Sequence, residues 1–213
     1  MMITLYTWTT PNGRKASIAL EEMGLPYEVR PVNITANAQF DAAFLAVSPN
    51  NKIPAIVDHD AAGGPVSVFE SGAVLVYLAE KSGQFLPASG AARARVLEWL
   101  FWQVGGPGPM LGQLMYFANR APEKLPLAIS RFCEESVRLV GVAEKRLTDT
   151  AYLGGDAYSI ADMATYPWLE RAMQPLRALA GDALQATPAL DRWMAAIAAR
   201  PAVQRGMALP KTN

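Results

Sequence analysis

The hydrophobic period of this chain changes once, near Gly83, and that change limits the folds the chain can adopt. Before Gly83, short β-type runs alternate with helical repeats, which is typical of a mixed α and β layer. A linker over 83–90, rich in Gly, Pro and Ser, is followed by apolar residues that recur with a helical period. We therefore expect an α+β domain over 1–84 and an all-α domain over 91–213.

The first domain is predicted to have the order βαβ, helix, ββα. Its first helix should end at Gly24, because a glycine C-cap is followed there by Pro26, which cannot continue the helix. Two strands joined through a helix are most simply parallel, with a right-handed crossover. We expect strands at 3–8, 27–32, 53–57 and 66–69, a short helical segment at 39–46 and a helix that opens at Glu70.

Composition excludes several classes of partner. The 213 residues carry 19 basic and 19 acidic side chains, so no net positive field favours nucleic acid or an anionic membrane. The sequence contains no charged leader followed by an apolar segment and no apolar run near the ~20 residues needed to span a bilayer. We expect a cytoplasmic protein that binds neither nucleic acid nor membrane.

The counts of cysteine and histidine also disfavour a metal site or an internal disulfide. A single cysteine cannot form an internal disulfide, and one cysteine with one histidine cannot complete a zinc site. Cys133 falls on the apolar stripe of a long helix and is expected in the core. His59 lies between two aspartates in a loop, and no GxSxG motif offers it a nucleophile.

Two features of the first domain favour a small anionic peptide as ligand. Pro54 belongs at a strand start or edge, where Ile53 keeps a backbone donor and acceptor for an extended peptide. Glu70 and Ser71 open a helix, so a carboxylate lies beside a hydroxyl and helix-start N–H groups, a set suited to an amino acid's zwitterionic end. Taken singly, Pro54 also fits a simple strand stop and Ser71 a plain N-cap.

These residues carry a resemblance to cytosolic glutathione transferases, whose fold joins a thioredoxin-like domain to an all-helical one. The strings Asn51-Lys52-Ile53-Pro54 and Phe69-Glu70-Ser71 lie in the first domain, and Ser159-Ile160-Ala161-Asp162 resembles the family's capping box. Longer strings resemble the bacterial nu class and the related fungal prion-forming nitrogen regulator. They are TPNG at 10–13, SPNNKIP at 48–54 and WLFWQVGG at 99–106.

The resemblance implies a set of glutathione-binding residues. Pro54 would be the family's cis-proline, which turns the Ile53 backbone toward the cysteinyl unit. Glu70 and Ser71 would hold the γ-glutamyl end. The glycyl carboxylate would lie near Lys52 and Gln39.

The resemblance also implies a homodimer, in which Arg131 reaches a glutathione carboxylate across the interface. Arg131 lies off the apolar stripe of its helix, so an alternative reading is a solvated surface arginine.

The corner at Thr10–Gly13 occupies the place where thioredoxin-like proteins carry Cys-Pro-x-Cys. Neither sulfur is present, so the attacking sulfur of any thiol–disulfide chemistry must belong to glutathione. Thr10, Asn12 and backbone N–H groups at the helix start would then stabilise its thiolate, because hydrogen bonds to a charged form lower its pKa. Tyr6 is the alternative activator, but the corner's alignment with tyrosine-type transferases places Thr7 at their tyrosine position.

Similarity to the nu class favours a glutathione-dependent disulfide-bond reductase, with organic hydroperoxide reduction as a further activity. Two alternatives stay open: conjugation of glutathione to electrophiles, and a non-catalytic regulatory protein that binds glutathione. A second-substrate pocket is expected to be lined in part from Val104 to Met115, where the Gly- and Pro-rich run 105–109 must break or bend the helix. No metal is expected, and the number of glutathione molecules per site stays open.

Overall fold

The computed structural model of this chain describes residues 2–211. The chain divides into two compact units, one formed by residues 2–88 together with 198–211 and the other by residues 89–197. The chain therefore leaves the first unit once and returns to it near its C-terminal end. The sequence-based boundaries, 1–84 and 91–213, stay a prediction of domain organisation.

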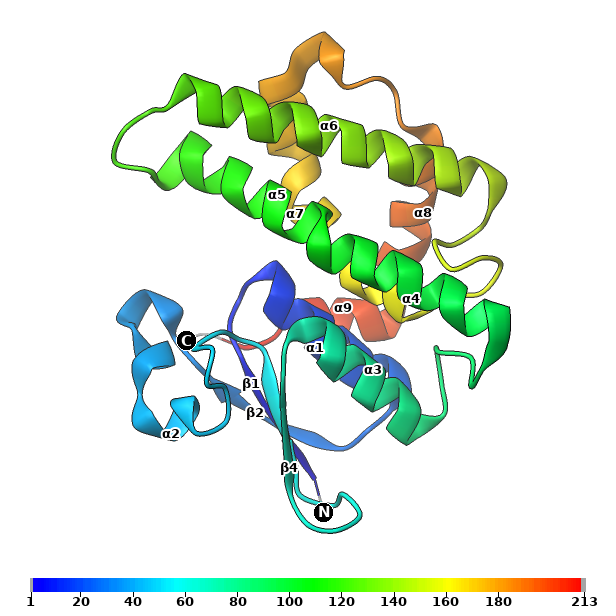
Figure 1. The fold of residues 1–213 in the computed structure, drawn as a ribbon. Helices are drawn as coiled ribbons and strands as arrows, with labels where there is room; N and C mark the ends of the chain where they lie inside the picture. Colours follow the sequence, from blue (N-terminus) through cyan, green and yellow to red (C-terminus); the bar gives the residue numbers. More distant parts are fainter. Residues whose placement is uncertain (1, 212–213) are drawn as a thin grey trace. The chain divides into compact units, whose positions relative to one another are not determined.

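The first unit is built on one four-stranded sheet of order β2-β1-β3-β4 within the described residues. Strands β1 and β2 are parallel, as predicted for strands joined through a helix, and the other two pairings are antiparallel. Helices α1 and α3 lie on one side of this sheet and α2 on the other (Figure 1). The elements of this unit are β1 (Ile3–Thr7), α1 (Pro11–Met23), β2 (Tyr27–Pro31), η1 (Ile34–Ala36), η2 (Ala38–Phe40), α2 (Ala42–Leu45), β3 (Ala55–Asp58), β4 (Val66–Phe69), α3 (Ser71–Ser82) and α9 (Pro201–Met207).

Local chemistry fixes both ends of α1. Thr10 is its N-cap, Pro11 occupies the first helical position, and Gly24 ends it in the left-handed conformation with φ 63°. The Gly24 stop was predicted. Residues 15–20 are all buried, because α3 and α9 both pack against this helix.

Helix α9 docks on α1 through an unusually close backbone approach. A Cβ added to Gly206 would lie 2.7 Å from both Cα and N of Ile18, so only glycine fits there. The Ser17 hydroxyl donates to the Gly206 carbonyl oxygen at 2.7 Å. Arg200 and Arg205 pair with Glu22 and Glu21 of α1, with closest distances of 2.6 and 2.5 Å.

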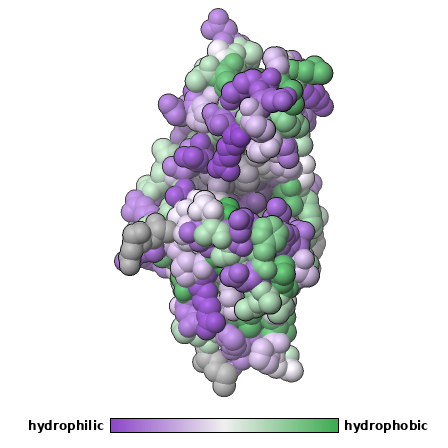
Figure 2. Space-filling model, turned by 90° about the vertical axis from the view of Figure 1, so that its left-hand side faces the viewer, coloured by the Kyte–Doolittle hydropathy of each residue, from purple (hydrophilic) through white to green (hydrophobic). Residues whose placement is uncertain are grey.

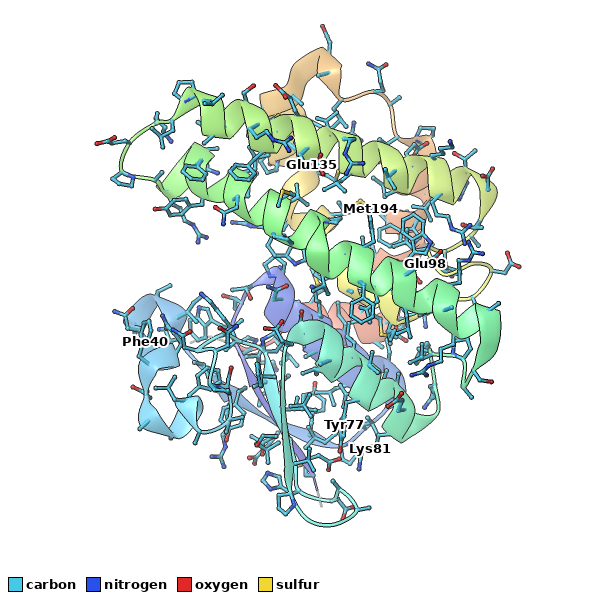
Figure 3. The ribbon with its side chains drawn as sticks, in the orientation of Figure 1. Phe40, Tyr77, Lys81, Glu98, Glu135 and Met194 are labelled. Carbon is cyan, nitrogen blue, oxygen red and sulfur yellow. The ribbon has the colours of Figure 1, made fainter. Side chains whose placement is uncertain are left out.

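An ion-paired aspartate ties β3 to α3. Asp58 is fully buried and accepts hydrogen bonds from the Tyr77 hydroxyl at 2.6 Å and from Lys81 Nζ at 2.8 Å. Figure 3 labels Tyr77 and Lys81 one turn apart on α3. Burial acts to raise the pKa of Asp58, but the bonds from Lys81 and Tyr77 prevail and hold it below the ordinary value.

The second unit contains helices and no β-strand within the described residues, as the helical period after Gly83 predicted. The predicted break at 105–109 separates α4 from α5, with Gly106 between them. The elements of this unit are α4 (Gly90–Gly105), α5 (Pro107–Met115), a π-helical turn η3 (Tyr116–Arg120), α6 (Pro126–Asp149), α7 (Ile160–Ala180), η4 (Gly181–Ala183) and α8 (Pro188–Ala198).

The predicted capping box at the start of α7 is present and extends into the core. Asp162 accepts from the Ser159 backbone and hydroxyl, from Leu153 N and from Trp193 Nε1, at 2.8 to 2.9 Å. Its full burial raises its pKa, against the effect of these four donors. The box therefore joins α7 to α8 as well as capping α7.

Within residues 2–211, every helix is too short or too polar to cross a lipid bilayer. Figure 2 shows hydrophilic and hydrophobic residues interspersed on the face that it draws. Phe40, labelled in Figure 3, is 56% exposed in η2.

Candidate functional site

The β1–α1 corner, Thr10–Gly13, uses Thr10 as a helix cap. Thr10 Oγ1 accepts a hydrogen bond from Gly13 N at 3.1 Å, and the Thr10 carbonyl accepts from Arg14 N at 3.0 Å. Since Oγ1 accepts here, its own hydrogen is directed toward another acceptor. The Gly13 and Arg14 N–H groups therefore both donate to Thr10 at the start of α1.

Gly13 is required at this corner by close packing. A Cβ at this position would collide with the Trp8 carbonyl oxygen and with Thr7 Oγ1. The absence of a side chain at the fourth residue of the corner therefore lets β1 turn directly into α1.

The segment before β3 presents Ile53 next to a cis-proline. The Ile53–Pro54 peptide bond is cis, as the resemblance implied. The β3 pairing begins at Ala55, so the Ile53 main chain lies outside the sheet ladder. Its side chain packs against the buried cluster of Val32, Phe44 and Ala55.

Glu70 and Ser71 form the start of α3. Glu70 has the left-handed φ of 70°, which is uncommon for a residue other than glycine, and Asn50 Nδ2 donates to its carboxylate at 3.3 Å. The turn that carries Asn50 is held by Asn51 N, which donates to Ser48 O at 2.9 Å. Two predicted segments, 48–54 and 69–71, thus meet in one place.

Lys15, a residue absent from the sequence-based site, lies directly behind Ser71. Its side chain is 1% exposed, and its Nζ donates to Ser71 Oγ at 3.2 Å. Burial lowers the pKa of Lys15 to about 7, against the opposing charge of Glu70. The single sequence offered little signal for this, since a helix lysine is usually solvated and this one is buried against α3, which lies far away in the sequence.

The other predicted ligands of the first unit lie on its loops. Gln39 is half-buried in η2, and its Oε1 is a buried acceptor with no hydrogen-bond partner within the described structure. Lys52 is exposed, and its carbonyl accepts from Ser48 Oγ at 2.8 Å. An unmatched buried acceptor at Gln39 fits a residue that meets a polar ligand.

Arg131 belongs to the second unit, where it is exposed on α6. Val104 to Met115, the expected lining of a second-substrate pocket, spans the end of α4 and the whole of α5 in that unit.

Three further residues, which the sequence analysis did not assign to the glutathione site, are Tyr6, His59 and Cys133. Tyr6 lies in β1 with its ring 5.9 Å from that of Phe44. His59 is exposed, with Nε2 at 2.9 Å from Thr4 Oγ1. Cys133 is half-buried rather than fully buried in α6, and burial together with the Glu134 charge raises its pKa.

Across the described range 2–211, no group of three His, Cys, Asp or Glu side chains is arranged to hold a metal ion.

Two family profiles match the chain. The profile of the glutathione S-transferase N-terminal domain matches residues 1–80, and that of the C-terminal domain matches residues 129–201.

Curated relatives extend this match over the whole chain. The disulfide-bond oxidoreductase YfcG of Escherichia coli is 49% identical over 214 residues, covering 100% of this chain and 96% of the relative. The disulfide-bond oxidoreductase YghU of the same organism is 39% identical, covering 99% and 76%.

Solved structures agree in fold. A Burkholderia graminis glutathione transferase with two glutathione molecules per subunit has a TM-score of 0.93 and 44% identity, covering 100% of this chain and 90% of that one. A Pseudomonas putida glutathione transferase with one glutathione disulfide per subunit has a TM-score of 0.92 and 41% identity, covering 98% and 92%. From these matches and its thioredoxin-like and helical units, the chain belongs to the glutathione S-transferase family.

Proposed function

We propose that this protein is a glutathione-dependent disulfide-bond reductase in which the thiolate of bound glutathione is the nucleophile. The observation that carries the proposal is the corner itself, where Thr10 and Gly13 stand in place of the two redox cysteines. The chain has one cysteine, Cys133, on α6 of the other unit, and its raised pKa disfavours a thiolate. The names of the curated relatives, both disulfide-bond oxidoreductases, support the same reaction.

In the proposed reaction, the glutathione thiolate attacks one sulfur of a small disulfide. A mixed disulfide forms, the original S–S bond breaks, and the released thiolate takes up a proton. A second glutathione thiolate then attacks the glutathione sulfur of the mixed disulfide, yielding glutathione disulfide and the second thiol. Two glutathione molecules supply the two electrons, and relatives that hold two glutathiones or one glutathione disulfide suit this stoichiometry.

The proposed catalytic residues are Thr10 and Asn12. A free thiol with a pKa near ~8.5 is only a few per cent ionised at neutral pH, so donors at the sulfur raise the fraction of the nucleophile. The Thr10 hydroxyl is suited to this because its oxygen already accepts from Gly13 N.

The proposed glutathione contacts follow the three residues of the peptide. Glu70 and Ser71 hold the γ-glutamyl end, where the carboxylate of Glu70 meets the ammonium group and the hydroxyl of Ser71 meets the carboxylate. The main chain of Ile53, placed by Pro54, pairs with the cysteinyl unit.

The glycyl carboxylate lies near Lys52 and Gln39 in this proposal. A homodimer in the cytoplasm completes it, with Arg131 reaching a glutathione carboxylate across the interface. Sedimentation of the wild-type protein and of Arg131→Gln, with glutathione titrations of both, tests this part.

The decisive experiment measures reduction of 2-hydroxyethyl disulfide by glutathione with the purified protein. We expect a rate well above the uncatalysed exchange, and a rate equal to it refutes the proposal. Parallel assays with an organic hydroperoxide and with a chloronitrobenzene electrophile test the peroxidase and conjugation activities. Tight glutathione binding without turnover in any of the three assays favours a regulatory binding protein instead.

A further inference from the structure

A buried lysine lies against the proposed γ-glutamyl site from the protein interior. Lys15 is the fifth residue of α1. Its side chain is among the largest fully buried side chains of the described chain. Its Nζ donates a hydrogen bond to the Oγ of Ser71, the first residue of α3. Ser71 itself is buried, with 8% of its surface exposed. One side chain thus connects the starts of the two helices that carry the proposed thiolate and glutamyl contacts.

The chemistry of this contact fixes the direction of the Ser71 hydroxyl. An ammonium group has three donors and no acceptor, so Ser71 Oγ must accept from a protonated Lys15. Its own hydrogen is then left for an acceptor on the other side of the oxygen. A ligand carboxylate is such an acceptor, and a hydroxyl that is itself accepting from a cation is a stronger donor to it.

A buried charge is also costly unless something compensates for it. Taking an ammonium group out of water is unfavourable, and the carboxylate of Glu70 is the charge that opposes this cost at Lys15. A ligand carboxylate at Ser71 would add a second compensating charge. A ligand anion beside Ser71 therefore improves the environment of Lys15 in its protonated form.

We propose that Lys15 is a positioning residue that orients the Ser71 hydroxyl toward the α-carboxylate of the γ-glutamyl group and so makes glutathione binding selective for that carboxylate. This inference rests on the proposed function, because it assigns Lys15 to the same ligand.

The test is a comparison of two ligands on matched variants. Glutathione and 4-aminobutyryl-cysteinyl-glycine differ only by the α-carboxylate. Titration calorimetry at pH 6.5 measures both affinities for the wild-type protein, Lys15→Met, Ser71→Ala and the double variant. Methionine replaces the lysine stem with an apolar chain of similar length, so this variant should fold, and Lys15→Gln serves as the second variant.

We expect Lys15→Met to weaken glutathione binding at least tenfold and to change binding of the decarboxylated peptide less than twofold. Adding Lys15→Met to Ser71→Ala should cause little further loss, because Lys15 acts through that hydroxyl. Lys81→Met is the control. It removes a lysine that pairs with Asp58 in the same unit, and its affinity for glutathione should stay within twofold of wild type.

Equal losses for both peptides would overturn the inference, since a merely structural lysine would affect them alike. Unchanged glutathione affinity in Lys15→Met and Lys15→Gln would overturn it as well, while leaving the proposed function intact. A wild-type protein that binds neither peptide would instead refute the proposed function, and the assignment of Lys15 with it.

Discussion

The Thr10 hydroxyl has two separable hydrogen-bonding roles. Its oxygen caps α1 by accepting from Gly13 N, and its hydrogen is the proposed donor to the glutathione sulfur. Loss of the cap costs about 1 kcal/mol of stability, whereas loss of a donor to a reacting anion typically costs about 10²-fold or more in turnover.

Thr10→Ala is therefore expected to lower kcat for 2-hydroxyethyl disulfide by about 10²-fold with a much smaller change in glutathione affinity. Thr10→Ser keeps both roles and should retain most activity. Asn12→Ala should likewise reduce kcat more than binding. Steady-state kinetics and calorimetry measure the two effects, and proportional losses would mean that these side chains only position the ligand.

Lys15 also predicts how stability varies with pH. The unfolded chain holds this proton up to the ordinary lysine pKa of 10.5, whereas the folded chain releases it at about 7. Between these values the unfolded state binds more protons, so the contribution of Lys15 to the free energy of unfolding rises with pH, at most by about 1.4 kcal/mol per unit. Glu70 is a charged neighbour of Lys15, while Arg200, the N-cap of α9, and Arg205 within α9 pair with Glu22 and Glu21.

Denaturant unfolding of the wild-type protein and of Lys15→Met, from pH 6 to 10 without glutathione, checks this sign. The variant should be the more stable protein at pH 6, and the difference should shrink as pH rises through 7 and beyond. A difference that is constant over the range would show that Lys15 keeps its proton in the folded state.

The features that could be predicted from the sequence are those that depend on residues close together in the chain. The Gly24 stop, the Glu70–Ser71 helix start and the Ser159–Asp162 box each depend on neighbours in the chain, and each is present. Lys15 was missed because it is buried against Ser71 of α3, which comes from a distant part of the sequence.

At the level of elements, the most sensitive contact of the first unit is the crossing of α1 and α9. Gly206→Ala places a methyl group 2.7 Å from the Ile18 backbone, so the helices must separate. The Ser17–Gly206 hydrogen bond would lengthen with them. We expect a loss of about 1–3 kcal/mol, as for other overpacked interiors.

Gly141→Ala on α6 is the control for Gly206→Ala, because it makes the same substitution within a helix where there is open space. A Cβ there meets nothing within 4 Å, so alanine should stabilise the helix by about 0.5–1 kcal/mol through its higher helix propensity. Thermal denaturation of the two variants should therefore shift in opposite directions. A Gly206→Ala protein as stable as wild type would show that α1 and α9 do not pack this closely.

Over the whole molecule, the hydrophobic period predicted which regions are α+β and which are all-α, but not which segments of the chain pack together. The period of two in the strands and of 3.6 in the helices is a local property, and it predicted the α+β and all-α parts. It does not say which helix packs on which. Residues 198–211 pack in the compact unit that contains the sheet, far along the chain from its other residues. This packing depends on contacts of Arg200, Arg205 and Gly206 with residues of α1, and such contacts cannot be predicted from a local sequence period.

This path makes the C-terminal segment a structural part of the thioredoxin-like unit. A chain that ends at Ala198 loses the buried Val203, the Gly206 contact and the arginines that pair with Glu21 and Glu22, while unit 89–197 keeps its own core. Hydrogen exchange should show lost protection in α1 and retained protection in α7, where Asp162 and Trp193 still pair. A chain that ends at Lys211 keeps all of α9 and should exchange like the full protein. Undiminished protection of α1 in the shorter chain would mean that the sheet-bearing unit folds without its C-terminal helix.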